Sequence, residues 1–258
     1  MNKIIFFGNG LLADAALEIL KQKFEVIFHA RTKEDLKKVK EIKRKSPEIY
    51  GVLASFGVII KSDVLDLFEP EGILNIHPSL LPLYRSASPI ESAILAGDND
   101  FSVSIMKLAK AMDAGPVYFQ TTLKNLPLEK TTIYRKLAKV GAKWICDNIN
   151  NLPNPVDQNN EKATFCGKLE KSMGILHPET DSADKIYRKI VAFQGFPKAK
   201  YAFYGKNCAI LEAHIAKPGE MAVLSLPCVD SKIVIIDRLQ PDGKKPMDAK
   251  SFLNGYNK

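Results

Sequence analysis

The sequence predicts an α/β protein in which a doubly wound, Rossmann-like domain precedes a small β-barrel of oligonucleotide-binding type. Within residues 1–151, short apolar runs alternate with amphipathic segments, as in βα units packed around a parallel sheet. Residues 148–160 are rich in Asn and Pro, which is typical of a linker. From residue 200 onward, short strands separated by Gly and Pro indicate a small barrel. We expect domains at 1–151 and 181–258 and a linker at 152–180.

Hydrophobic periodicity predicts each element of the first domain in turn. Apolar runs predict strands, and apolar side chains at helical spacing predict helices. The run at 51–60 is apolar or small throughout, as a strand buried on both faces requires. The expected strands are 3–7, 24–28, 51–60, 73–76 and 101–108, and the expected helices are 11–23, 88–96 and 131–150.

The second domain is expected to begin with a helix and to continue as short strands. Residues 182–193 have helical spacing. Apolar stretches bounded by Gly205, Pro218 and Pro227 then predict strands at 201–203, 208–215, 222–226 and 232–236.

Composition excludes several classes of protein. The chain has no run of about 18 apolar residues, so we expect no membrane span. Its apolar start is too short for a signal peptide, and we therefore expect a cytoplasmic protein. Its four cysteines are widely spaced without a C-x-x-C pair, which indicates reduced thiols and no metal site.

The net charge of +8 indicates attraction to polyanions, although excess Lys also serves solubility. Residues 31–45 carry eight basic and three acidic side chains. Residues 181–258 carry thirteen basic and eight acidic side chains. A basic run is usually a solvated helix face, but it can also follow a phosphate backbone. Both interpretations remain open at this point.

A G-x-G-x-x-A pattern at Gly8, Gly10 and Ala13 follows the first strand and opens the first helix. This pattern occurs in nicotinamide-nucleotide sites, and Arg31 at the end of the second strand would suit a 2′-phosphate. The glycines equally permit a tight strand-to-helix turn, which is the interpretation we favour. An NADP-dependent reductase remains an alternative of a different class.

The most informative stretch is Asn75-Ile76-His77-Pro78. In a strand, residues two apart point to the same face, so Asn75 and His77 project together. Asp113, in a loop after another predicted strand, can join them. An amide that holds an oxyanion, an imidazole that moves a proton and a carboxylate that orients the imidazole are the groups that acyl transfer needs. The alternative is an ordinary strand end before a proline.

Three segments carry a resemblance to a known family. They are the run from Gly72 to Ile90, Met112-Asp113-Ala114-Gly115, and Leu239-Gln-Pro-Asp-Gly-Lys-Lys-Pro-Met247. The first closely resembles the signature of the folate-dependent formyltransferases. The last resembles a stretch in the barrel domain of members that act on tRNA. Ser86 and Ala114 depart from the usual Gly and Thr, and the basic loop that grips tRNA is shortened here to about residues 31–45.

The resemblance implies roles for individual residues. Asn75, His77 and Asp113 would be catalytic. On chemical grounds we further expect Asn75 and His77 to hold the oxyanion, and Asp113 to orient His77 and raise its pKa through its opposite charge. The residues expected to bind 10-formyltetrahydrofolate are Phe56, Gly57, Ile59, Ser79, Leu80, Leu81 and Pro82. The residues expected to contact nucleic acid are Lys37, Lys38, Lys43, Arg44, Arg85, Lys244 and Lys245.

The function implied is transfer of a formyl group from 10-formyltetrahydrofolate to the α-amino group of initiator methionyl-tRNA, by a monomer and without a metal. An alternative acceptor is the amine of a sugar nucleotide, because formyltransferases of that kind share the core and also append a barrel-like domain. A requirement for tRNA separates the two.

Overall fold

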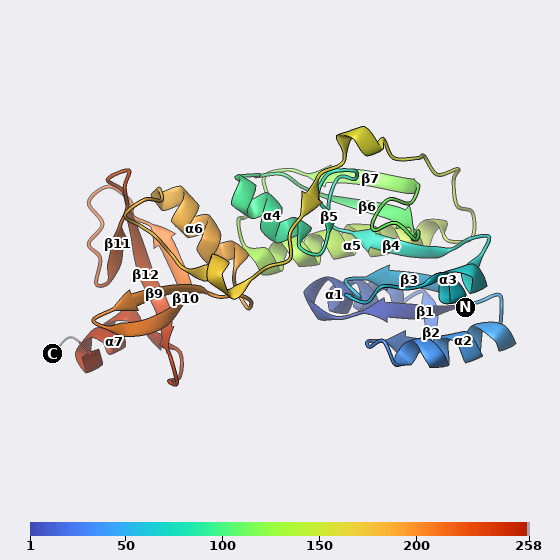
Figure 1. The fold of residues 1–258 in the computed structure, drawn as a ribbon, viewed down its shortest axis with the longest axis horizontal. Coiled ribbons are helices and arrows are strands. Elements are labelled where there is room, and N and C mark those ends of the chain that lie inside the picture. Colours follow the sequence, from blue (N-terminus) through green and yellow to red (C-terminus); the bar gives the residue numbers. More distant parts are fainter. Residues whose placement is uncertain (257–258) are drawn as a thin grey trace. The chain divides into compact units, whose positions relative to one another are not determined.

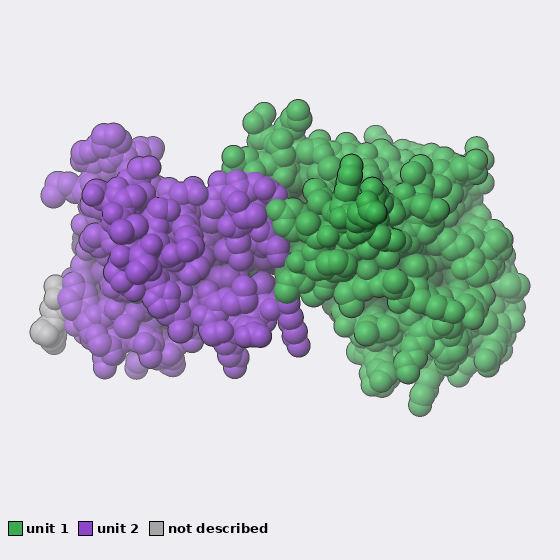
Figure 2. Space-filling model, turned by 45° about the horizontal axis from the view of Figure 1, so that its top comes forward, with its two compact units in different colours: residues 1–90, 99–167 green, residues 91–98, 168–258 purple. Residues whose placement is uncertain are grey.

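The N-terminal part of the chain is built around a six-stranded sheet, and the C-terminal part around a smaller antiparallel sheet (Figure 1). The computed structural model describes residues 1–256, so the last two residues of the predicted second domain lie outside the described residues. The chain divides into unit 1, residues 1–90 and 99–167, and unit 2, residues 91–98 and 168 onward (Figure 2). Residues 152–167 thus belong to unit 1.

The large sheet has the strand order β2-β1-β3-β4-β6-β7. The first four strands in this order run parallel, whereas β4 pairs with β6, and β6 with β7, antiparallel. The doubly wound α/β class is confirmed, and β6 runs antiparallel to both of its neighbours in this sheet. The strands are β1 (Asn2–Gly8), β2 (Phe24–Ala30), β3 (Tyr50–Ala54), β4 (Ile73–His77), β6 (Phe101–Lys107) and β7 (Val117–Leu123).

Helices cover both faces of this sheet. On one face α1 (Gly10–Leu20) packs against α5 (Lys130–Asn148), and α5 lies on β4 and β6. A Cβ at Gly141 of α5 would lie 2.7 Å from Cγ2 of Ile76, so only glycine permits this approach of helix to strand. On the other face α2 (Asp35–Lys45) packs on β2 and on α3 (Ser62–Leu65). Residues Arg85–Ser86 (β5) and Phe165–Cys166 (β8) form a separate short parallel pair.

The turn between β1 and α1 gives the glycine pattern a structural explanation. A Cβ at Gly8 would lie 2.0 Å from the main-chain oxygen of Ala54, at the end of the neighbouring strand β3. The next residue, Asn9, donates its main-chain N–H to the oxygen of Ser55 at 3.0 Å. Gly8 is therefore required by the close approach of β1 to β3.

Unit 2 encloses its own apolar core. Its sheet has the order β11-β12-β10-β9, with β13 paired to β12, and α6 and α7 pack on this sheet. Most of α4 (Pro89–Ala96) belongs to this unit, and Nη1 of Arg188 donates to the main-chain oxygens of Ile94 and Asp98 within it. The remaining elements are α6 (Ala183–Ala192), β9 (Ala199–Phe203), β10 (Lys206–Ile215), β11 (Ser225–Pro227), β12 (Ile233–Pro241), β13 (Met247–Asp248) and α7 (Ala249–Tyr256).

Element boundaries differ from expectation where tertiary contacts decide them. The strand expected at 51–60 ends at Ala54, and residues 55–60 form a loop in which Ser55 and Gly57 have positive φ. The strand β7 and the helix α7 were not predicted. Within residues 1–256, no helix is long and apolar enough to cross a membrane. The four cysteines are free thiols.

Candidate active site

Two polar side chains project from the same face of the buried strand β4. Asn75 and His77 alternate with Ile76, whose own face is covered by α5, so the amide and the imidazole point away from that helix. Both residues are buried, and each has only 4% of its surface exposed. A strand surrounded by apolar neighbours thus carries two buried polar groups, and such groups are retained where they are hydrogen-bonded or functional.

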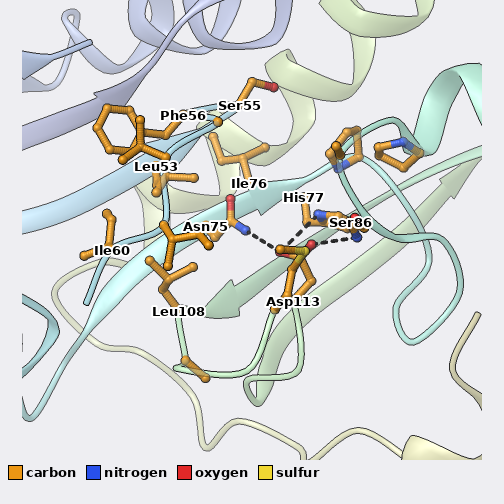
Figure 3. A pocket seen from close by; sticks show the side chains of 18 of the residues that line it. Leu53, Ser55, Phe56, Ile60, Asn75, Ile76, His77, Ser86, Leu108 and Asp113 are labelled. Carbon is orange, nitrogen blue, oxygen red and sulfur yellow. Dashed lines mark hydrogen bonds and ion pairs between the residues drawn. The ribbon is translucent and has the colours of Figure 1, made fainter. Parts of the chain in front are cut away.

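The loop after β6 brings a carboxylate to this pair (Figure 3). Oδ1 of Asp113 accepts a hydrogen bond from Nδ2 of Asn75 at 3.5 Å and lies 3.7 Å from Nδ1 of His77. Oδ2 accepts the main-chain N–H of Ser86 at 2.8 Å. The structure therefore brings together the amide, imidazole and carboxylate that the sequence singled out.

Burial dominates the protonation of His77. Desolvation lowers the pKa of the imidazole below its ordinary value of 6.5, and the nearby Asp113 carboxylate opposes this without overcoming it. Asp113 thus acts in the expected direction and raises the pKa of His77, but burial outweighs this contribution and the net pKa is lowered. Nε2 lies 3.1 Å from the main-chain oxygen of Tyr84, which can only accept. This contact places the proton on Nε2 and leaves Nδ1 as the free acceptor of the neutral ring.

The three groups lie at one end of a pocket of about 380 Å³. Figure 3 shows its wall, which is mainly apolar and comes from the end of β3, the following loop and the loop after β6. Apolar walls with a few convergent polar groups are the usual form of a small-molecule site. The wall includes Leu53, Phe56, Ile60 and Leu108, and the polar end is formed by Asn75, His77, Ser86 and Asp113.

The residues expected to bind folate fall into two groups. Phe56, Gly57 and Ile59 line the pocket, and Ile59 is 72% exposed at its edge. Ser79, Leu80, Leu81 and Pro82 do not line it.

The physical reason is that this turn packs toward β6. The Ser79 hydroxyl donates to the main-chain oxygen of Leu83 at 2.6 Å, and Leu81 packs on Met106 and Val117. The folate-binding role expected for these four residues stays a prediction.

Two of the residues expected to bind nucleic acid are buried. Lys43 is 4% exposed, and its ammonium donates to the main-chain oxygens of Pro47 and Ile49. Arg85 is 3% exposed, and its guanidinium is held by Gln158 and Asn160. Neither charge faces solvent, so the expectation was wrong for both. Lys37, Lys38 and Arg44 on α2, and Lys244 and Lys245 between β12 and β13, are exposed.

Sequence reasoning missed several residues around the site. Ser86 contributes its main-chain N–H, which no side-chain pattern reveals. Gln158 comes from the Asn- and Pro-rich stretch that predicted a linker, and it contacts the Asp113 loop. Among the described residues, no group of three or more His, Cys, Asp and Glu side chains is placed to hold a metal ion.

Comparison with known proteins decides the family. The family described as Formyl transferase matches residues 8–149, and Formyl transferase, C-terminal domain, matches residues 168–257. The chain belongs to the formyl transferase family. The first match contains all three residues of the polar cluster in this formyltransferase.

A curated relative of this formyltransferase is the methionyl-tRNA formyltransferase of Dehalococcoides mccartyi strain CBDB1. The two are 36% identical over 240 residues, which cover 86% of this chain and 76% of the relative.

Solved structures share the fold. HypX from Aquifex aeolicus, in complex with tetrahydrofolic acid, matches with a TM-score of 0.76 and 18% identity over 100% of this chain and 48% of HypX, so the formyltransferase spans about half the length of HypX. Methionyl-tRNA formyltransferase from Clostridium thermocellum matches with a TM-score of 0.67 and 20% identity, covering 93% and 98% of the two chains. The N-formyltransferase from Helicobacter canadensis, in complex with folinic acid and dTDP-3-aminofucose, matches with a TM-score of 0.65 and 17% identity. The match covers 93% of this chain and 100% of the Helicobacter protein.

Proposed function

We propose that this formyltransferase transfers the formyl group of 10-formyltetrahydrofolate to the free α-amino group of initiator methionyl-tRNA. The observation that carries the proposal is the convergence of Asn75, His77 and Asp113 at the end of one apolar pocket. Membership of the family supplies the reaction class, and the name of the Dehalococcoides relative supports the acceptor. We assign catalytic roles to these three residues.

The pocket suits a folate. A reduced pterin is flat and largely apolar in its ring faces, and Leu53, Phe56, Ile60 and Leu108 present apolar surface to such a ring. Phe56, Gly57 and Ile59 keep the folate-binding role that the sequence predicted for them. When bound, the folate supplies an activated formyl group on a nitrogen that can leave.

The polar groups divide the work of the transfer. One N–H of Asn75 points toward Asp113, and the amide has a second N–H to donate to the formyl oxygen as negative charge develops there. Nδ1 of the neutral His77 accepts the proton that the attacking amine loses, and the proton is then available to the departing nitrogen. Because the Nε2–H of His77 faces the oxygen of Tyr84, we assign the oxyanion to Asn75 alone, in place of the role that the sequence led us to expect for both residues. Asp113, 3.7 Å from Nδ1, stabilises the imidazolium while it exists.

The tRNA is held by exposed basic side chains. Lys37, Lys38 and Arg44 in unit 1, and Lys244 and Lys245 in unit 2, are free of burial and suit phosphate contacts. Lys38 also forms an exposed ion pair with Glu41, which costs little to break. In this proposal the protein acts as a monomer in the cytoplasm.

The test is formylation of initiator tRNA charged with methionine, measured as formyl-methionine after deacylation. His77→Asn removes the proton acceptor, and His177→Asn changes an exposed histidine of unit 2 as the matched control. We expect product from the parent protein and the control, and none above background from His77→Asn.

Two other results would overturn the proposal in different ways. If the parent binds 10-formyltetrahydrofolate in calorimetry but formylates no tRNA, the acceptor is wrong, and a sugar-nucleotide amine is the next to assay. If a folded parent binds no folate, the donor is wrong.

A further inference from the structure

The chain between α5 and unit 2 is part of the catalytic unit. Val117 and Val156 exchange two main-chain hydrogen bonds of 2.8 Å, which fix the start of this stretch on β7. Further along, the main-chain N–H of Arg85 donates to the oxygen of Thr164 at 2.9 Å, and β5 pairs with β8. Residues 156–166 are therefore held at both ends against the segments that surround the polar cluster.

Gln158, in the middle of this stretch, contacts the loop that carries Asp113. Its Nε2 donates to the main-chain oxygen of Asp113 at 2.9 Å and to that of Gly115 at 2.7 Å. A single amide group thus uses both of its hydrogens on one loop. It touches the main chain on either side of Ala114 and leaves the Asp113 carboxylate free to face Asn75 and His77.

Arg85 fixes the orientation of that amide. Oε1 of Gln158 accepts from Nε of Arg85 at 3.1 Å and from Nη2 at 2.7 Å, and Nη2 also donates to Oδ1 of Asn160 at 2.8 Å. The guanidinium has no acceptor atoms, so it must face the oxygen of Gln158, which turns the NH2 group toward the loop. Arg85 is 3% exposed, and hydrogen bonds to a buried charged group are strong.

The Asp113 loop needs an external support. Asp113 has φ of +49°, in the left-handed region where a residue with a side chain is uncommon. The carboxylate itself makes one short hydrogen bond, to the N–H of Ser86, and a long one of 3.5 Å from Asn75. Ser86 adjoins Arg85, so one short segment supports the loop both directly and through Gln158.

We propose that Gln158, oriented by Arg85, is a positioning residue that holds the Asp113 loop so that the carboxylate faces His77. This rests on the proposed function for its effect on rate, although the positioning itself can be measured without any substrate. The competing interpretation is that Gln158 only stabilises the fold.

The test variant is Gln158→Met, which keeps length and charge but removes both donors and the acceptor. The control is Asn160→Ala, which removes the exposed second acceptor of Arg85 and leaves Gln158 untouched. Hydrogen–deuterium exchange on the substrate-free protein should show faster exchange in residues 110–116 of Gln158→Met and unchanged exchange there in the control. With substrates, kcat should fall about 10- to 100-fold, as expected for a displaced catalytic group, with little change in the KM for folate.

A spectroscopic readout separates positioning from simple destabilisation. The charged groups that face His77 are Asp113, which raises its pKa, and Arg85, which lowers it. Gln158→Met introduces no charge, and Arg85 keeps its hydrogen bond to Asn160 while Asp113 can move away. The imidazole of His77 should therefore titrate at a lower pH than in the parent, by histidine ring NMR. A purely structural role predicts a lower Tm with no change in this titration.

A second variant protects the test against misfolding of the first. Gln158→Glu keeps an acceptor for Arg85 but loses both donors to the loop, and we expect its kcat to fall as well. The proposal is overturned if exchange in residues 110–116 is unchanged, or if either variant keeps the kcat of the parent. A parent that formylates no tRNA would refute the proposed function, whereas the exchange result would still decide the positioning role.

Discussion

Replacement of Asn75 by leucine tests the division of labour in the polar cluster most directly. Leucine has nearly the shape of asparagine, so Asn75→Leu removes the amide donor from β4 without opening a cavity. The amide nitrogen carries two hydrogens, and the structure shows only one of them directed at Asp113, over 3.5 Å. The second hydrogen is the one that the proposed mechanism uses.

The geometry sets the expected magnitudes. A hydrogen bond of 3.5 Å lies beyond the usual range, so its loss should lower the free energy of unfolding by less than about 1 kcal/mol. Loss of a donor to a developing oxyanion costs about 10²- to 10³-fold in kcat, or about 2.7 to 4 kcal/mol. The variant should therefore lose rate out of proportion to stability, with the KM for folate little changed.

The assay compares single-turnover formylation, folate binding and thermal unfolding of Asn75→Leu with those of Leu74→Ile. Leu74 precedes Asn75 on the same strand, is 1% exposed and does not line the pocket, so its substitution disturbs packing without touching a donor. A fall of less than about 10-fold in kcat, or an equal loss in both variants, would refute the assignment of Asn75 to the oxyanion.

Three further predictions follow from particular contacts. Because burial lowers its pKa, His77 should stay neutral at pH 6.5, and a ring resonance that is assigned with His77→Asn and titrates at or above that value would contradict this. Lys43→Met should lower the free energy of unfolding by about 1 to 3 kcal/mol, since the main-chain oxygens of Pro47 and Ile49 lose their donor, and leave tRNA affinity unchanged. The variant Arg44→Met, at the neighbouring exposed position, should leave the free energy of unfolding unchanged. It should weaken tRNA binding and reduce the dependence of tRNA affinity on salt concentration. Hydrogen bonds from Asp237 and Glu220 raise the pKa of His214, so the ion pairs should stabilise unit 2 by less than about 1 kcal/mol below pH 6.5 and lose this effect as the pH rises. Denaturant unfolding of His214→Asn across this range checks the sign.

The sequence predicts best those parts of the site that local geometry determines. Asn75 and His77 share a face because side chains alternate along any strand, so their pairing needed no knowledge of the fold. Phe56, Gly57 and Ile59 were expected from the resemblance of their segment to the wall of a folate pocket. They line the pocket described here because they follow the buried strand β3, and α/β sheets bind ligands beyond the carboxyl ends of their strands. Ser79 to Pro82 lie outside this pocket, and the sequence could not show this because the packing of Leu81 on Met106 depends on which strand lies beside β4.

A run of basic residues predicts a nucleic-acid contact only where the side chains are known to be exposed. The basic run on α2 looks uniform in sequence, yet Lys43 points inward over the ring of Phe68 at 4.5 Å while Arg44 faces solvent. Arg85 was expected to contact nucleic acid, but its side-chain partners Gln158 and Asn160 lie more than seventy residues away along the chain. Such long-range pairings leave no periodic signal, and polar stretches such as 152–160 are therefore predicted as linkers.

The three polar residues of the site are held in place in two different ways, and mutations that affect each of them should have different consequences. Asn75 and His77 are held by β4, whose contacts with β3, β6 and α5 also hold the fold together, so changes there, as at Ile76, act on stability and activity at once. Asp113 is held by hydrogen bonds from Ser86 and Gln158, which lie outside the large sheet and its apolar core. Loss of these bonds should release the loop and leave the sheet intact. The carboxylate is therefore the member of the cluster whose position can be altered with the least cost to folding, and substitutions around residue 158 should change the rate of transfer before they change Tm.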